Sequence, residues 1–201
     1  MYGSVKTLKH VFSVVPVDLK SNAGIAVASE KLSALKMYSA NADGTTYGLT
    51  YKVGGTTEDA YSVIAKVDGK NVYTSETYYS DKHRYVYFAL TADCNITEDD
   101  NDLIFEIDYY DKGTLNLVMV YNRIIKSGEK DDYVPARQQV LVAEQEDSLT
   151  WKTAVVEVSN AALRNSGNSS GSSFGILLPY KNDPGLINVR EIRVIKKSEY
   201  E

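Results

Sequence analysis

The chain contains only one cysteine, Cys94, so it cannot form an internal disulfide bond. Its two histidines, His10 and His83, are far apart, whereas zinc sites need several His, Cys or carboxylate ligands at close spacing. No run approaches the roughly 18 consecutive apolar residues of a membrane span. Met1 is followed by Tyr-Gly-Ser and not by a basic and then apolar signal segment. The sequence therefore indicates either a protein that stays inside the cell or a segment of a longer secreted chain.

The charge balance is mildly acidic. There are 22 basic and 27 acidic residues, which gives a formal net charge of −5. No basic stripe of the kind that nucleic-acid binding needs is present, and no polybasic run suits an anionic membrane surface. We therefore expect neither a nucleic acid nor a membrane as partner.

What the chain does have is tyrosine and strand-forming sequence. It has 16 Tyr against 4 Phe and 1 Trp, and tyrosine suits half-buried strand faces. Residues Arg84–Leu90 are apolar on both faces, which predicts a central strand buried on each side. In Leu103–Tyr109 the odd positions are apolar, and we expect the opposite face, with Glu106 and Asp108, to meet solvent. The segment Asp111–Gly113 then predicts a β-hairpin turn into a second strand.

The remaining strands follow at short intervals. They are predicted over Leu115–Tyr121, Gln138–Ala143, Trp151–Val158, Phe174–Leu178 and Ile187–Ile195. The apolar phase changes within the last of these, and a bulge near Arg190 would reconcile the two halves. Many short strands separated by Gly, Asn and Asp turns predict an antiparallel sandwich or barrel. Upstream, Val5–Val17 predicts an edge strand interrupted by Pro16, and Ser29–Tyr38 fits helix or strand equally.

Catalytic and metal-binding patterns are weak. Residues 167–171 formally match G-x-S-x-G, but both histidines lie upstream, so a Ser/Gly loop is favoured over a nucleophile elbow. Glu106 and Asp108 share a strand face with attachment points roughly 7 Å apart, a spacing compatible with a glycosidase pair. Such pairs are also ordinary on a solvent-facing strand. The acidic run Glu98–Asp102 suits calcium chemically, although a solvated turn is the simpler interpretation.

An ordered set of short signatures resembles a known group of modules. Tyr109-Tyr110-Asp111-Lys112-Gly113 follows a strand, Thr150–Ala154 opens another, and an Asn/Gly-rich loop precedes the apolar strand from Phe174. Over about residues 45–197 this resembles the galactose-binding-domain-like β-sandwich modules attached to bacterial polysaccharide-degrading enzymes. Modules of this type often carry Ala-Asp-Phe-Arg-Ile where this chain has Ser172-Ser173-Phe174-Gly175-Ile176, so contacts of that acid and arginine are in doubt.

The resemblance implies an all-β, antiparallel jelly-roll sandwich over residues 45–201. Residues 1–44 would be strands or an extension packed on the same sandwich. The resemblance also implies a non-catalytic carbohydrate-binding module, extracellular or at the cell surface, that anchors a linked or partner enzyme to a polysaccharide. Structural calcium is a further implication, without ligands that can be mapped onto this sequence. Two alternatives stay open: an adhesion or assembly sandwich that binds protein, and an enzyme that uses the Glu106–Asp108 pair.

Sugar recognition needs an aromatic ring for the C–H face and planar polar groups for the hydroxyls. Three loop groups offer this chemistry, although each also fits an ordinary exposed loop. Trp151 is predicted to be a core anchor, with a sugar platform as the alternative. The candidate ligand-binding residues are Tyr180, Asn182 and Asp183 in the first group, Tyr78, Tyr79 and His83 in the second, and Tyr133 in the third.

Overall fold

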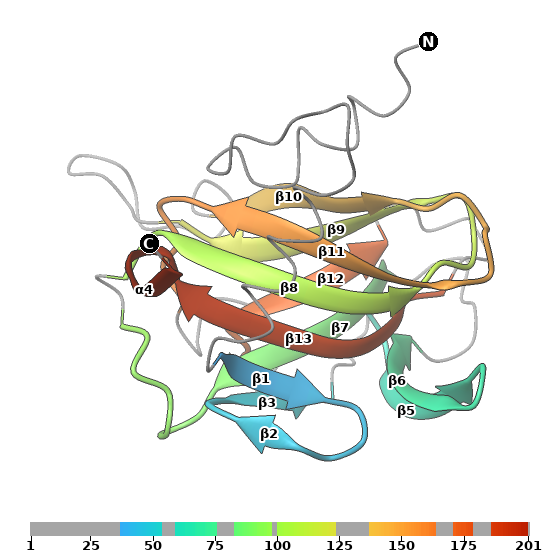
Figure 1. Ribbon diagram of the computed structural model, residues 1–201, viewed down its shortest axis with the longest axis horizontal. Coiled ribbons are helices and arrows are strands. Elements are labelled where there is room, and N and C mark those ends of the chain that lie inside the picture. Colours follow the sequence, from blue (N-terminus) through green and yellow to red (C-terminus); the bar gives the residue numbers. More distant parts are fainter. Residues whose placement is uncertain are drawn as a thin grey trace, which may run out of the picture.

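The computed structural model describes residues 37–53, 59–75, 83–97, 100–123, 137–163, 171–178 and 186–200. These residues form two stacked sheets whose strands pair antiparallel, apart from one short parallel ladder (Figure 1). The predicted all-β antiparallel sandwich is confirmed. Within this described part of the chain, no helix is long and apolar enough to cross a membrane.

Sheet A has seven strands in the order β11-β8-β13-β1-β2, with β6 also paired to β13 and β5 paired to β6. A four-residue helix, α4 (Lys197–Tyr200), follows β13. The strands are β1 (Tyr38–Asn41), β2 (Thr46–Tyr47), β5 (Ser62–Val67), β6 (Lys70–Ser75), β8 (Leu103–Tyr110), β11 (Trp151–Val158) and β13 (Asn188–Lys196).

Sheet B has six strands in the order β10-β9-β12-β7-β3, with β4 parallel to β7. The predicted central strand over Arg84–Leu90 is confirmed: β7 lies between β12 and β3, and Arg84–Ala89 are buried. The strands are β3 (Leu49–Lys52), β4 (Asp59–Ala60), β7 (His83–Leu90), β9 (Asn116–Asn122), β10 (Arg137–Glu144) and β12 (Phe174–Leu178).

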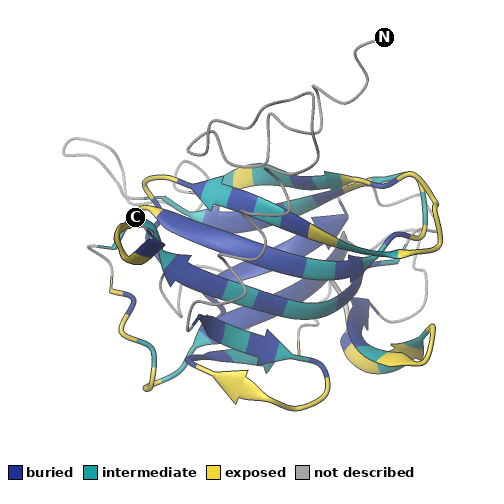
Figure 2. Ribbon diagram, viewed as in Figure 1, coloured by how far each residue is buried: buried dark blue, intermediate teal, exposed yellow. Residues whose placement is uncertain are grey.

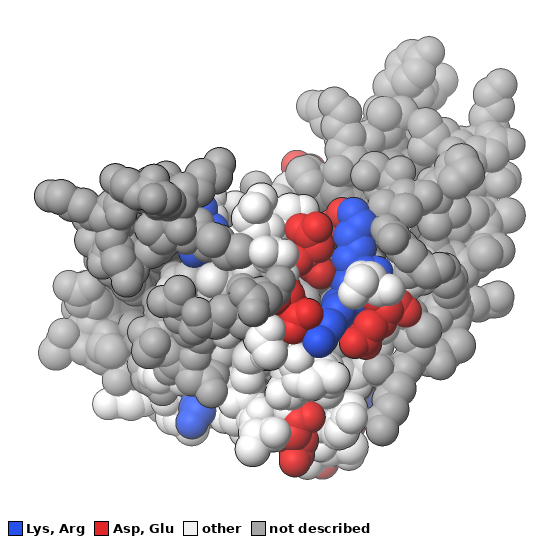
Figure 3. All heavy atoms as spheres, turned by 90° about the vertical axis from the view of Figure 1, so that its left-hand side faces the viewer, with Lys and Arg blue, Asp and Glu red and all other residues white. Residues whose placement is uncertain are grey.

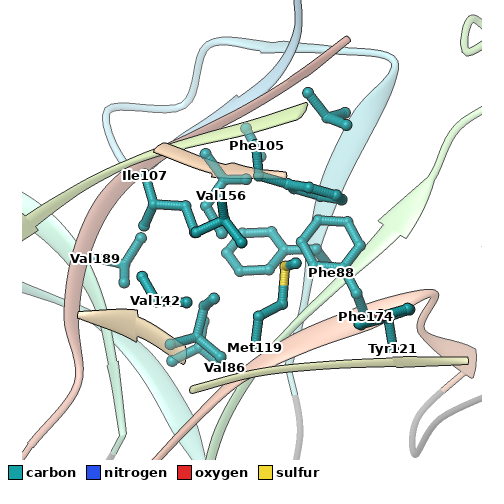
Figure 4. Close-up of a cluster of buried hydrophobic side chains, with 14 of the residues drawn as sticks. Val86, Phe88, Phe105, Ile107, Met119, Tyr121, Val142, Val156, Phe174 and Val189 are labelled. Carbon is teal, nitrogen blue, oxygen red and sulfur yellow. The ribbon is translucent and has the colours of Figure 1, made fainter. Parts of the chain in front are cut away.

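The core lies between the two sheets, where alternate residues of each strand meet (Figures 2 and 4). Phe174 of sheet B packs against Phe105 of sheet A with ring centroids 5.1 Å apart, and against Phe88 at 5.4 Å. Both contacts lie within the range in which aromatic pairs add to burial. The period-2 pattern of the strands thus builds the sandwich, since each strand contributes one apolar face to the same core.

The predicted hairpin at Asp111–Gly113 is wrong. β8 pairs with β11 and β13 in sheet A, whereas β9 pairs with β10 and β12 in sheet B. The segment between β8 and β9 therefore crosses from one sheet to the other, and the segment between β10 and β11 crosses back. Alternation reveals which face of a strand is buried but not which sheet it joins, because both sheets bury a face in the same core.

A buried carboxylate ties the two crossing segments together at one end of the sandwich. The side chain of Asp111 is fully buried and accepts hydrogen bonds from the Glu146 amide at 3.1 Å and the Ser148 hydroxyl at 2.6 Å. Lys152 Nζ lies 2.7 Å from the same carboxylate. Burial alone would raise the pKa of Asp111, but the bonds from Lys152, Ser148 and the backbone outweigh it and hold that pKa below its usual value.

We expect Asp111→Asn to lower the free energy of unfolding at pH 7 by about 3 kcal/mol, because it removes the buried charge that the loop donors bond and leaves Lys152 paired with the exposed carboxylate of Glu146. The folded-state pKa of Asp111 is depressed, so its stabilisation is complete above about pH 4 and is lost as the pH falls through that pKa. Urea unfolding at pH 7 and pH 3 measures both effects. Asp93→Asn, at an exposed turn residue, is the control, and equal losses in the two variants would contradict the expectation.

The bulge predicted near Arg190 is confirmed. The register of β13 against β8 shifts between Val189, which pairs with Tyr109, and Glu191, which pairs with Asp108. Both Val189 and Ile192 are then fully buried in the core, although two residues separate them. The extra residue, Arg190, has no partner in this ladder, as expected for a bulged position.

Gly175 stands where the resembling modules carry an arginine, and the structure gives a steric reason. Gly175 pairs with Tyr87, and a Cβ atom at position 175 would lie 2.8 Å from Cδ1 of the Tyr87 ring. Tyr87 in turn stacks on Tyr85, with centroids 5.0 Å apart and an interplanar angle of 8°. Tyr87 therefore takes the space that a side chain at position 175 would fill.

Gly175→Ala should lower the free energy of unfolding by about 1–3 kcal/mol, the usual range for overpacking. Chemical denaturation measures the change, and the matched control is the same substitution in a Tyr87→Ala background. We expect the effect of Gly175→Ala to shrink there, because the obstructing ring is gone. The same loss in both backgrounds would mean that Tyr87 is not the obstacle.

The structure also places the start of the described chain. β1 pairs with β13, so residues 38–41 are part of sheet A, and Tyr38, Ala40 and Ala42 belong to the core. Residues 1–36 of the proposed 1–44 extension, with the strand predicted over Val5–Val17, lie outside the described residues, as does the G-x-S-x-G loop except Gly171. So does the helix-or-strand segment Ser29–Tyr38, apart from its last two residues.

Candidate functional site

The ligand-binding residues predicted from sequence fall outside the described part of the chain: Tyr78, Tyr79, Tyr133, Tyr180, Asn182 and Asp183, and the side chain of His83. The strands on either side of two of these segments are described. Leu178 pairs with Arg84, and Asn188 with Thr74, so the strands flanking 76–82 and 179–185 end at one side of the sandwich.

The strands that flank Tyr133 end at the opposite side. There, Asn122 pairs with Arg137, and Tyr121 pairs with Phe174 at the start of β12. The strands on either side of the Tyr133 segment thus end away from those that flank the other two segments.

Trp151 lies on the outer face of sheet A, at the side of the sandwich where β6 and β12 end. It pairs with Tyr110, which is next to Tyr109, the partner of Val189 at the start of β13. The interpretation of Trp151 as a core anchor is wrong: Ala154, Val156 and Val158 form the inward face of β11, and Trp151 has the opposite phase and is half-buried. The sequence predicted the strand but did not show whether its first residue points into the core or to the outer face.

Residues of two strands and a turn contact the Trp151 ring. Its indole N–H donates to Asp68 Oδ2 at 2.9 Å, and Lys70 Nζ lies 4.5 Å from the ring centroid. The ring of Tyr110 lies 5.3 Å away at an angle of 59°. Asp68 and Lys70 come from the β5–β6 hairpin, so this hairpin is fastened to the outer face through the indole.

The sequence analysis missed the β5–β6 hairpin, although its signal is present. Asp68 and Gly69 both have positive φ, 48° and 76°, as the central residues of a type I′ turn require. An Asp-Gly pair between strand-forming runs, here Ser62–Val67 and Lys70–Ser75, is among the strongest short-range indications of such a hairpin.

Two residues further along β8 and β11, charged and polar side chains take the place of the aromatic pair Tyr110 and Trp151. Asp108 lies two residues before Tyr110 on β8, roughly 7 Å away along the strand, and accepts a hydrogen bond from the exposed Thr153 at 2.7 Å. Arg190 approaches Asp108 to 3.9 Å and Asp43 to 4.0 Å. The amide of Ala42 donates to Arg190 O at 2.8 Å, which holds the β1–β2 turn beside the bulge.

Arg193 and its partners form the buried part of this surface. Arg193 lies 2.9 Å from both Glu106 and Asp108, and 2.6 Å from Glu191. Burial opposes the charge of Arg193, but the bonds and charges of Asp108 and Glu106 outweigh it and raise its pKa above the ordinary value. The prediction that Glu106 meets solvent is wrong, since Glu106 is 4% exposed and paired with Arg193.

We call this surface the outer-face cluster. It joins an aromatic pair to carboxylates, cations and a hydroxyl on the outer side of one sheet. Its members are Asp43, Asp68, Lys70, Glu106, Asp108, Tyr110, Trp151, Thr153, Arg190, Glu191 and Arg193.

The outer face of sheet A changes character toward α4. There Ile104, Ile195 and Tyr200 of α4 form a separate apolar cluster with Met37, so α4 covers that end of the face. Acidic and basic side chains alternate on this end of the molecule (Figure 3). Lys196 lies 3.0 Å from Asp100, and Lys197 pairs with Glu157.

The acidic run Glu98–Asp102 shows no calcium geometry in its described part. Asp100 Oδ2 accepts hydrogen bonds from the Thr97 amide at 2.7 Å and its hydroxyl at 3.0 Å, besides pairing with Lys196. Across the described ranges, no group of three or more His, Cys, Asp or Glu side chains could hold a metal ion. Structural calcium therefore has no ligand set among these residues.

No family model matches the sequence, and no curated protein matches it. Among solved structures, the chain is similar to a low-affinity xylan-binding module, CBM86, from Roseburia intestinalis. The identity is 14%, with 83% of this chain and 100% of the module covered at a TM-score of 0.39.

Two adhesin domains of Lys-gingipain from Porphyromonas gingivalis are also similar. The K1 domain has 11% identity, covers 81% of this chain and 99% of its own, and has a TM-score of 0.40. The K3 domain has 10% identity, 79% and 90% coverage, and a TM-score of 0.36. Likenesses this distant neither place the chain in a family nor assign it a ligand.

The ion pairs of Arg193 yield a stability prediction. Arg193→Met should lower the free energy of unfolding by about 3 kcal/mol, because it leaves Glu106 buried and unpaired. Adding Glu106→Met should recover part of that loss, since the uncompensated charge is then removed as well. Urea denaturation of the single and double variants measures the coupling. A double variant less stable than Arg193→Met alone would contradict the pairing.

Proposed function

We propose that this protein is a non-catalytic carbohydrate-binding module that binds a polysaccharide through the outer-face cluster. The observation that carries the proposal is Trp151, a half-buried aromatic ring on an outer sheet face, oriented by Asp68. Asp108 and Thr153 lie two residues further along the paired strands β8 and β11, and Arg190 approaches Asp108 from β13 on the other side of β8. An aromatic ring for the sugar C–H face, with planar polar groups for its hydroxyls, is the combination that sugar recognition uses.

Lys70 supports the assignment of the ring face as a binding surface. Its ammonium lies over the indole, where the ring quadrupole attracts polarised X–H groups, and a lysine stem is flexible enough to swing aside. Tyr78, Tyr79, His83, Tyr180, Asn182 and Asp183 are proposed to extend the surface, because the strands flanking their segments end at the same side as Trp151.

Such a module would hold a linked or partner enzyme near its substrate outside the cell, so that a modest affinity raises the effective concentration of that enzyme. The Glu106–Asp108 pair does not supply a competing catalytic centre in this proposal. Both carboxylates bond the same guanidinium, and Glu106 is buried beneath the cluster. Release of reducing sugar from a polysaccharide panel, abolished by Glu106→Gln, would instead establish an enzyme.

The test uses affinity gels containing xylan, mannan, glucan or pectin, together with fluorescence of the single tryptophan. We expect retardation by at least one polysaccharide, with a change in Trp151 emission on binding. Trp151→Ala should weaken retardation by roughly 30-fold, the effect of losing a central aromatic contact of about 2 kcal/mol. The matched control is Tyr61→Ala, which removes a different aromatic side chain that is 49% exposed. This variant should bind as the wild type does.

Absence of retardation by every polysaccharide would overturn the proposed function. Retardation that Trp151→Ala leaves unchanged would overturn the assignment of the site and move it to another surface. Retardation of the wild type separates these two outcomes, and because the chain has only one tryptophan, a change in emission on binding reports on the Trp151 site alone.

A second function, protein binding in adhesion or assembly, is favoured by one feature. Tyr61, Val63 and Ile64 expose 49%, 37% and 51% of their surface beside or within β5, which pairs only with β6 among the described strands. Apolar side chains on an edge strand promote association with other chains. A stable oligomer in analytical ultracentrifugation, lost in Ile64→Lys, would support this function.

A further inference from the structure

The two arginines of the outer-face cluster differ in how their hydrogen-bond donors are used. Arg193 bonds three carboxylates at 2.6–3.2 Å. Arg190 makes only the two long contacts of 3.9 Å and 4.0 Å, and its Nε is buried with no hydrogen-bond partner. A guanidinium has five N–H donors, and distances beyond about 3.2 Å are not hydrogen bonds.

The two carboxylates beside Arg190 are accessible enough to take part in recognition. The side chain of Asp43 is 49% exposed, that of Arg190 is 31% exposed, and that of Asp108 is 16% exposed. Each distance of about 4 Å between Arg190 and a carboxylate is longer than a single hydrogen bond between donor and acceptor. A hydroxyl group that lies beside the two atoms, about 2.8 Å from each, can bridge them, since it accepts one hydrogen bond and donates another.

The charge of the surroundings selects against anions. The outer-face cluster contains five carboxylates, from Asp43, Asp68, Glu106, Asp108 and Glu191, against three cationic side chains, from Lys70, Arg190 and Arg193. The surplus of two negative charges has the same sign as the net charge of −5 of the whole chain, of which it is a part. An anionic polymer would be repelled, whereas an uncharged one would not.

We infer that Arg190, between Asp43 and Asp108, binds adjacent hydroxyl groups, and that the ligand is an uncharged glycan with free vicinal hydroxyls. The inference rests on the proposed function and specifies its ligand class. One sugar stacks on Trp151, and a neighbouring sugar presents its hydroxyls to Arg190. The two residues lie on β11 and β13, on either side of β8, so their backbones are roughly 10 Å apart across the sheet. Arg190 accordingly determines specificity, while Trp151 supplies contact area.

The test titrates the wild-type protein and two variants with hexasaccharides by isothermal calorimetry. Xylohexaose, cellohexaose and mannohexaose have free vicinal hydroxyls and no charge. Laminarihexaose has no vicinal pair on its internal sugars, and hexagalacturonate has vicinal pairs but one carboxylate per sugar. We expect at least one of the first three to bind, and the last two to bind at least about tenfold more weakly.

Arg190→Gln should weaken binding of the preferred hexasaccharide by roughly tenfold to a hundredfold, the effect of losing hydrogen bonds from a charged group. Lys66→Gln removes one positive charge from an exposed position on β5 and should leave binding unchanged. Because Arg190 makes no close hydrogen bond through its side chain, its replacement should leave the melting temperature close to that of the wild type, which a thermal melt verifies.

The outcomes separate this inference from the function on which it rests. If the wild type binds a sugar but Arg190→Gln binds equally well, the role of Arg190 is overturned and the function stands. If laminarihexaose or hexagalacturonate binds as tightly as the preferred sugar, the ligand class is overturned. If the wild type binds none of the hexasaccharides and no polysaccharide, the proposed function fails together with the inference.

Discussion

The sandwich depends on a carboxylate that no solvent reaches. The two chain crossings between the sheets run side by side, and Asp111 of one crossing takes its hydrogen bonds from Glu146 and Ser148 of the other. Lys152, at the start of β11, neutralises the charge. Without such a partner set, a buried carboxylate would oppose folding. With these partners, the Asp111 carboxylate fixes where β8 and β10 end and where β9 and β11 begin.

The position of these ends determines what β11 presents to solvent. Trp151 immediately precedes Lys152, which bonds Asp111, and alternate residues of a strand point to opposite faces. The bond that directs Lys152 to the crossing loops therefore directs Trp151 to the outer face of sheet A. The aromatic ring of the candidate site is in this sense a consequence of the buried ion pair beside it.

Much of this fold could be predicted because burial leaves a period-2 pattern in the sequence. β8 and β9 were predicted in this way, β7 and β12 from residues that are apolar on both faces, and the phase change of β13 correctly indicated the bulge at Arg190. The hairpin at Asp111–Gly113 could not be judged from that pattern. A tight turn between two strands and a crossing between two sheets look alike in sequence, and only the pairing of each strand distinguishes them.

The candidate site was less predictable, and the reason is physical. Its residues come from the β1–β2 turn, the β5–β6 hairpin, β8, β11 and β13, and they meet only through strand register. Sequence reasoning favoured loops because exposed rings and amides gather there. Glu106 shows a second limit: a charged residue on an alternating strand predicts a solvated face, but a cation on the neighbouring strand lets that face be buried.

The bulge explains why one arginine of the cluster is structural and the other is available. Arg193 lies in regular register opposite Glu106, so its guanidinium meets the carboxylates of the neighbouring strand at close range. Arg190 is the extra residue of the bulge, and its backbone has no position in that ladder. A bulge re-aims the side chain that it carries. Here it places a guanidinium between Asp43 and Asp108 at distances too long for direct bonds, and its donors are left for a ligand. The same backbone irregularity that keeps Val189 and Ile192 in the core thus produces a polar group on the surface whose hydrogen bonds the fold does not use.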